Sequence, residues 1–255
     1  MAVSATKERL IIGACTMNPK ERIILALDVS DYDEAVDIVQ KFKAQVDIFK
    51  VGSELFTSVG PRIVKQIHLM GKKVFLDLKF NDIPNTVSKA VLAAARLGVY
   101  IVNVHALGGL EMMRRAADTM REFTLRENME RPRLIGVTVL TSIDQKTLRD
   151  ELGVELRMSA EVKHLAGLAQ QAGLDGVVAA PGDVEMIRSR FGRDFLIITP
   201  GIRPSWAAAD DQKRTLTPAK AISLGSDYLV IGRSILAQGD PLGALRKIQE
   251  EIAGA

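Results

Sequence analysis

Cysteine and histidine are scarce in this sequence: Cys15 is the only cysteine, and three histidines occur in 255 residues. A single cysteine cannot form an intrachain disulfide or a zinc site built from several thiolates, so the composition favours a reducing compartment and a cytoplasmic protein. Basic residues are scattered, and the formal net charge is only +3. No nucleic-acid partner is therefore predicted, although this charge distribution is compatible with a small anionic substrate.

Long apolar runs and the common catalytic signatures are also absent. The apolar run at residues 10–15 is too short for a signal-peptide core or a membrane span, so no membrane association is predicted. We expect residues 1–20 to form a flexible extension before one domain at 21–255. The sequence has no G-x-x-x-x-G-K-[ST], no G-x-G-x-x-G after a strand and no H-E-x-x-H. The sequence therefore lacks the motifs typical of nucleotide hydrolysis, dinucleotide redox chemistry and zinc proteolysis. We predict no cofactor and no metal.

Short β-branched apolar runs alternate with segments of helical periodicity from Arg22 onward, which is typical of repeated βα units. Eight such runs occur, at 22–28, 46–52, 73–79, 99–105, 133–140, 175–180, 195–201 and 227–232. Eight strands with intervening helices favour a closed barrel over a doubly wound sheet. No linker or change of composition divides the chain. The sequence therefore predicts the α/β class and a single (β/α)8 barrel, the TIM-barrel fold.

Charged side chains collect at the predicted strand ends, where a barrel carries its active site. Asp77 and Lys79 end the third run, Asp82 follows in its loop, and Lys50 and Asp28 end the second and first runs. Strand side chains alternate, so Asp77 and Lys79 are expected to share the face that points into the barrel mouth. One such pair is more typical of a salt bridge or a solvated strand end. Several charges converging on one mouth favour an active site with a lysine general acid.

The last two strands end in TPGIRP (199–204) and VIGRSI (230–235). Barrel enzymes often bind phosphate at these two loops, where glycine lets an anion approach the backbone. Turn glycines alone are weak indicators. Arg203 and Arg233 add forked donors that match phosphate oxygens, so the two loops together favour a phosphate site.

Taken together, these segments resemble the orotidine 5′-phosphate decarboxylase family. The similarity covers about residues 22–250, and its most specific part is DLKFNDIPNT at 77–86. Further matching segments are LALDV at 25–29, FKVG at 49–52, VTVLTS at 137–142, TPGIRP and VIGRSI. The resemblance implies a cofactor-free carboxy-lyase that converts orotidine 5′-monophosphate to uridine 5′-monophosphate (UMP) and CO₂, the last step of pyrimidine biosynthesis.

The resemblance also implies residue roles. Lys79 would protonate carbon 6 of the pyrimidine after CO₂ leaves, and Asp77 would lie beside the substrate carboxylate. Lys50 would bridge Asp77 and the ribose hydroxyls, and Asp28 would bind the ribose. The implied protein is a homodimer in which part of one subunit enters the neighbouring site: Asp82, Ile83 and Thr86. The segment that meets the base would supply Thr141 and Ser142, and the phosphate would be held by Arg203, Gln212, Gly232 and Arg233.

Two features are not explained by the family pattern. The stretch SWAAADD at 205–211 has Trp206 and three alanines where the family usually has glycine. The sequence therefore does not predict whether this loop closes over a bound phosphate. His105 ends the fourth predicted strand. We expect it to make a structural hydrogen bond, because the resemblance assigns the acid role to Lys79.

Two other functions are compatible with parts of this sequence. Metal-dependent sugar-phosphate decarboxylases and aldol synthases share a D-x-K-x-x-D segment, but they need a carboxylate where this chain has Lys50. A non-catalytic barrel that binds a phosphorylated ligand would keep the arginines. Such a barrel has no reason to bury Lys50, Asp77, Lys79 and Asp82 together against their desolvation cost.

Overall fold

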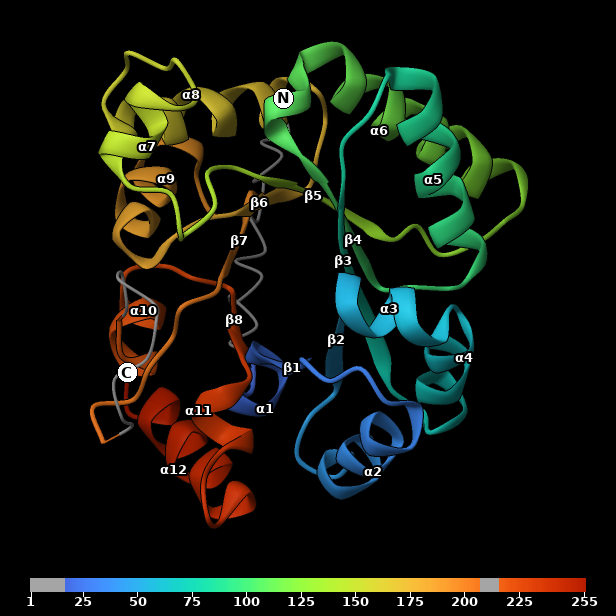
Figure 1. Cartoon of the computed structure of the whole chain (residues 1–255), viewed down its shortest axis with the longest axis vertical. Helices are drawn as coiled ribbons and strands as arrows, with labels where there is room; N and C mark the ends of the chain where they lie inside the picture. The colour runs from blue at the N-terminus through green and yellow to red at the C-terminus, as the bar shows by residue number, and fades with distance from the viewer. Residues whose placement is uncertain (1–16, 207–215) are drawn as a thin grey trace, which may run out of the picture.

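The protein is a closed barrel of eight parallel strands in sequence order, as a computed structural model describes it for residues 17–206 and 216–255 (Figure 1). The strands are β1 Ile23–Leu27, β2 Ile48–Gly52, β3 Lys73–Phe80, β4 Ile101–His105, β5 Arg133–Val137, β6 Gly176–Val178, β7 Leu196–Thr199 and β8 Tyr228–Ile231. β8 closes the ring by pairing with β1, with Ile24 opposite Val230. The predicted (β/α)8 barrel is confirmed. Most of the predicted extension lies outside the described residues.

Helices surround the barrel on the outside, as Figure 1 shows. The α-helices are α1 Pro19–Arg22, α2 Tyr32–Phe42, α3 Ser53–Val59, α4 Arg62–Leu69, α5 Pro84–Arg96, α6 Gly109–Arg126, α7 Gln145–Asp150, α8 Met158–Gln171, α9 Val184–Phe191, α10 Pro218–Ser223, α11 Arg233–Leu236 and α12 Pro241–Ala253. Two 3₁₀ turns are η1 Ala106–Gly108 and η2 Pro181–Asp183. No helix in the two described ranges is both long and apolar enough to span a membrane.

Local sequence explains where these helices begin and which side they bury. α2 begins after Asp31, whose carboxylate accepts the backbone N–H of Glu34 at 2.9 Å, a side-chain cap. Its buried residues Ala35, Val39 and Phe42 recur at helical spacing on one face. That face packs against the barrel, in the same apolar cluster as Ile23, Leu25 and Leu27.

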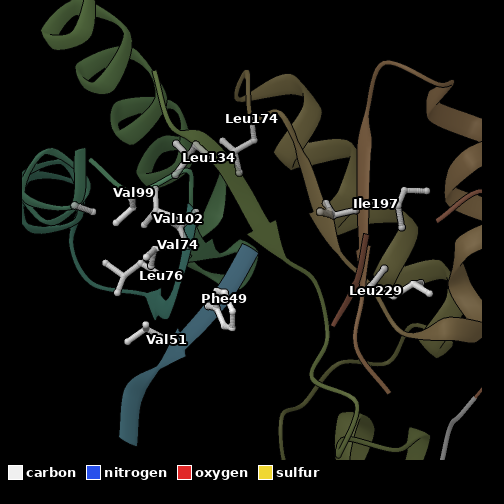
Figure 2. Close-up of a cluster of buried hydrophobic side chains, with 14 of the residues drawn as sticks. Phe49, Val51, Val74, Leu76, Val99, Val102, Leu134, Leu174, Ile197 and Leu229 are labelled. Carbon is white, nitrogen blue, oxygen red and sulfur yellow. The ribbon is translucent and has the colours of Figure 1, made fainter. Parts of the chain in front are cut away.

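Alternation along the strands separates two apolar layers. Ile23, Leu25 and Leu27 of β1 belong to a large cluster with helix residues, which therefore fills the space between barrel and helices. Figure 2 shows further members of this layer, such as Phe49 on β2 and Leu76 on β3. A second cluster has only strand residues at its centre and fills the barrel interior: Ile24, Ile48, Phe75, Ile101, Ile135, Ile198 and Tyr228.

The interior layer forms the floor of the functional end. Two residues further along each strand the side chain returns to the same inward face. At that level Ile48 is followed by Lys50, Phe75 by Asp77, and Ile101 by Asn103. Polar groups thus begin where the apolar layer ends, at the carboxyl end of the barrel.

Candidate active site

A cavity of about 250 Å³ opens at the carboxyl ends of the strands. Residues from β1, β2, β3 and the segments after β5 to β8 line it. Most of the predicted site residues are among them: Asp28, Lys50, Asp77, Lys79, Thr141, Gly232 and Arg233. Apolar side chains such as Val137 and Val178 cover the opposite wall. The cavity therefore has one charged side, one apolar side and one glycine-rich end.

Asp77 lies at the centre of the charged side. Its Oδ1 accepts hydrogen bonds from Lys79 Nζ at 2.8 Å and Asn103 Nδ2 at 2.6 Å, and its Oδ2 lies 3.6 Å from Lys50 Nζ. Lys50 Nζ also donates to Asp28 Oδ1 at 2.9 Å. Carboxylates and ammonium groups thus alternate along a row of four side chains.

The alternation lets the row withstand burial. The side chains of Lys50 and Asp77 are only 11% and 13% exposed, and an unpaired charge so enclosed would cost several kcal/mol in desolvation. Lys79 is 35% exposed, Asp28 is 54% exposed, and both line the cavity, so a bound ligand can reach these two ends of the row.

Strand β3 is not regular at this point. Leu76 pairs with Val102 and Phe80 with Val104, so three residues of β3 stand opposite one residue of β4. Within this bulge Lys79 has φ of +51°, a left-handed conformation that costs a non-glycine residue about 1–2 kcal/mol. Simple alternation predicted that Asp77 and Lys79 share a face. Their side chains do meet, but through a bulge that re-aims Lys79.

Asn103 is the site residue that the sequence analysis missed. It lies on the inward face of β4, is fully buried, and accepts the backbone N–H of Lys79 through Oδ1 at 2.8 Å. A signal existed: an amide residue interrupts the apolar run Ile101–Val104 at the inward position. Asn103 lies within β4 and not at its end, so a search for polar residues at strand ends does not find it.

The glycine-rich end lies between β7 and β8. Gly201 has φ of +74°, which favours glycine. A Cβ atom on Gly232 would stand 3.2 Å from Ala26 Cβ and from Asp28 Oδ2, so only glycine fits there without a shift. Arg233 lines the cavity at the start of α11. Arg203 lies outside the lining, in the segment that pairs with Leu216, and Gln212 lies outside the described residues.

Four predicted residues point elsewhere in this subunit. Asp82, Ile83, Thr86 and Ser142 are exposed and are not among the residues that line the cavity. Ile83 is 66% exposed, and the Asp82 carboxylate accepts the N–H of Ile83 at 2.6 Å. The four-charge cluster expected around Asp82 therefore forms around Asp28 instead.

The histidine at the end of β4 makes the expected structural contact. His105 Nδ1 accepts the backbone N–H of Leu107 at 3.4 Å. Burial lowers the pKa of His105 below its usual 6.5, and the positive charge of Lys79 lowers it further, so the ring is neutral at pH 7. Within residues 17–206 and 216–255, no three histidine, cysteine or acidic side chains are arranged to hold a metal ion.

Comparison with known proteins matches residues 21–248 to the model of the orotidine 5′-phosphate decarboxylase / HUMPS family. The chain belongs to this family. It is 51% identical over 236 residues to the orotidine 5′-phosphate decarboxylase of Syntrophotalea carbinolica, which covers 92% of the chain and 96% of that relative. The decarboxylase of Trichlorobacter lovleyi is 53% identical over 234 residues, 91% of the chain and 95% of that relative.

Two solved structures have the same barrel. The orotidine 5′-phosphate decarboxylase of Lactobacillus acidophilus superposes with a TM-score of 0.80 at 38% identity, over 91% of this chain and 99% of that one. An uncharacterized conserved protein from Geobacillus kaustophilus superposes with a TM-score of 0.79 at 40% identity, over 90% and 99%. The resemblance inferred from DLKFNDIPNT is therefore confirmed at the level of the family.

Proposed function

We propose that the chain decarboxylates orotidine 5′-monophosphate to UMP and CO₂, as a carboxy-lyase of pyrimidine biosynthesis. The observation that supports this most directly is the alternating row of Asp28, Lys50, Asp77 and Lys79 beside the cavity at the carboxyl ends of the strands, in a member of this family. The reaction leaves an electron pair on carbon 6, and nothing in the pyrimidine delocalises it. The row places fixed charges close to that carbon, where they can stabilise the developing negative charge.

The four charges divide the work in the proposed reaction. As the bond between carbon 6 and the carboxylate breaks, the electron pair stays on carbon 6 and CO₂ departs. Lys79 stabilises that charge as an ammonium ion and then gives its proton to carbon 6. Asp77 faces the substrate carboxylate and disfavours the ground state, while Lys50 offsets part of its charge. Asp28 accepts hydrogen bonds from the ribose.

Binding of the remote groups positions the ring. Arg233 and the backbone around Gly232 and Gly201 take the phosphate, where the missing side chains let oxygens approach N–H groups. Arg203 and Gln212 complete that end in the proposal, and Thr141 and Ser142 meet the base. Phosphate affinity is thereby converted into orientation of carbon 6 against Lys79.

The active unit in this proposal is a homodimer. Asp82, Ile83 and Thr86 are exposed at the start of α5 and contribute nothing to their own cavity, which supports their entry into the neighbouring site. An isoleucine 66% exposed beside a hollow between α5 and α6 is the kind of apolar feature that a subunit contact covers. We place this dimer in the cytoplasm, with the barrel domain at 21–255.

Loss of the ultraviolet absorbance of orotidine 5′-monophosphate tests the reaction, with purified protein and excess chelator. Metal-independent turnover is expected. Activity that disappears with chelator would instead indicate the metal-dependent sugar-phosphate group, and ligand binding without turnover by folded dimer would indicate a binding barrel.

Mixing two inactive variants tests the shared site. Lys79→Ala and Asp82→Ala are each expected to be inactive, but a mixed dimer has one site with both native residues. Remixing should restore about one quarter of native activity, as random pairing of two subunits requires. No recovery in a sample shown to contain mixed dimers would contradict the shared site.

A further inference from the structure

Asn103 occupies a position where β3 and β4 no longer pair by backbone hydrogen bonds. The β3 bulge leaves the N–H of Lys79 without a regular ladder partner, and Asn103 Oδ1 accepts it at 2.8 Å. The other end of the same amide, Nδ2, donates to Asp77 Oδ1 at 2.6 Å. One fully buried side chain therefore contacts both the lysine and the aspartate of the reacting row.

The orientation of this amide is fixed by its neighbours. A backbone N–H can only donate, so it requires the amide oxygen, and an ionised carboxylate can only accept, so it requires the amide nitrogen. Both requirements select the same orientation. A leucine of similar size would satisfy neither group, and it would leave the Lys79 N–H and the Asp77 carboxylate each short of a partner.

We propose that Asn103 is a positioning residue for the decarboxylation: it holds Asp77 Oδ1 in place and locks the left-handed backbone that aims Lys79 into the cavity. This inference rests on the proposed function. Lys79 adopts φ of +51°, a left-handed conformation that is unfavourable for a residue with a side chain and persists only where its surroundings fix it. The Asn103 carbonyl is the contact that does so from β4.

Asn103→Asp separates the two contacts. The introduced carboxylate still accepts the N–H of Lys79, but when ionised it cannot donate to Asp77 and instead repels it. Protonation at lower pH restores a donor. The other titratable groups around this position are Asp77 and Lys79 on β3, Lys50 on β2, Asp28 after β1, and His105 on β4. Dividing the kcat of the variant by that of the native chain at each pH cancels their common contribution.

The experiment measures kcat and KM for orotidine 5′-monophosphate between pH 6 and 9 for the native chain, Asn103→Asp and Asn103→Leu. Asn128→Asp is the matched control, because it makes the same change at an exposed residue outside the cavity. We expect kcat to fall roughly 100-fold in Asn103→Leu with KM within a few-fold of native, the size of effect that misplaced catalytic groups produce. For Asn103→Asp the loss should be largest at pH 9 and shrink as the pH falls.

Native-like kcat in either folded variant would overturn the inference, as would a loss in Asn103→Asp that increases as the pH falls. If neither variant folds, hydrogen exchange of the Lys79 amide in the native chain tests the same contact: protection supports it, and exchange at the rate of an exposed loop overturns it. Absence of turnover in the native chain would instead refute the proposed function. The two failures are thereby distinguished.

Discussion

Asp227, before β8, and Asp77, on β3, stand at opposite ends of the barrel, and each contacts positively charged side chains. Asp227 Oδ2 accepts the backbone N–H of Ile197 at 2.7 Å and Arg188 at 2.6 Å. Asp175, before β6, repeats the arrangement with the N–H of Leu134 at 2.7 Å and Arg131 at 2.9 Å. At the amino end, each aspartate therefore ties its own strand to the preceding strand.

At the carboxyl end the acidic groups instead hold positively charged side chains beside a cavity. Asp77 binds Lys79 and Asn103, and both lysines of the row line the open space. The backbone there is strained at Lys79. At the amino end, by contrast, the Asp227 carboxylate that pairs with Arg188 also accepts the backbone N–H of Ile197. The difference indicates that the amino end is built for stability and the carboxyl end for chemistry, a division typical of this fold.

The largest expected effect is on the carboxyl end. Lys79→Gly should lower kcat by roughly 10³-fold or more, because it removes the proposed proton donor and its charge together. The free energy of unfolding should change by no more than about 1 kcal/mol, since glycine adopts a positive φ without strain. Steady-state assays and urea unfolding measure the two quantities. A loss of stability as large as the loss of transition-state stabilisation would break the comparison.

The opposite pattern is expected at the amino end. Asp227→Ala removes the partner of Arg188 and of the Ile197 N–H, and it should lower the free energy of unfolding by about 2–3 kcal/mol. The kcat of the folded protein should stay within about twofold of native. Asp194→Ala, at an exposed aspartate, is the control and should change stability by less than about 0.5 kcal/mol. A kcat that collapses in folded Asp227→Ala would contradict the division of roles.

A smaller effect compares two histidines. Burial lowers the pKa of His68, near the amino end, and of His105, near the carboxyl end, but only His105 also feels the charge of Lys79. Lys79→Ala should therefore raise the pKa of His105 and leave that of His68 unchanged, as histidine NMR signals would report. An unchanged His105 would mean that Lys79 does not act on it.

Stability should also follow these histidines. Both native pKa values lie below the unfolded value of 6.5, so the unfolded chain binds more protons below that pH. Their contribution to the free energy of unfolding is complete above pH 6.5 and is lost as the pH falls through the native pKa values. His105→Gln should reduce this loss between pH 7 and pH 5. An equal loss in the variant would assign the effect to other groups.

The barrel was predictable because its signal is repeated eight times. Each β-branched run, such as Ile23–Leu27, predicts a strand regardless of the helix that follows it. The predicted and observed strands differ only at their ends: the run at 133–140, for example, forms the shorter strand Arg133–Val137. Strand-end position also sufficed to place Lys50, Asp77 and Lys79 in one cavity. Their proposed catalytic roles come from the family resemblance and remain predictions.

The bulge and its consequences were not predictable from pattern alone. No glycine or proline marks the bulge in residues 76–80, and a side chain on β4 sustains it, which only the folded neighbourhood reveals. Asp82 was expected beside Lys79 because the two are close in sequence. The turn that follows β3 instead exposes it, and loop direction depends on tertiary contacts that spacing does not encode.

The most direct test is the initial rate of orotidine 5′-monophosphate loss with the native chain and with Lys79→Ala, in one chelator-containing buffer and with UMP binding measured alongside. We expect rapid turnover by the native chain and a loss of roughly 10³-fold or more in the variant, which should still bind UMP. Native-like turnover by Lys79→Ala, or no turnover by correctly folded native dimer, would contradict this expectation.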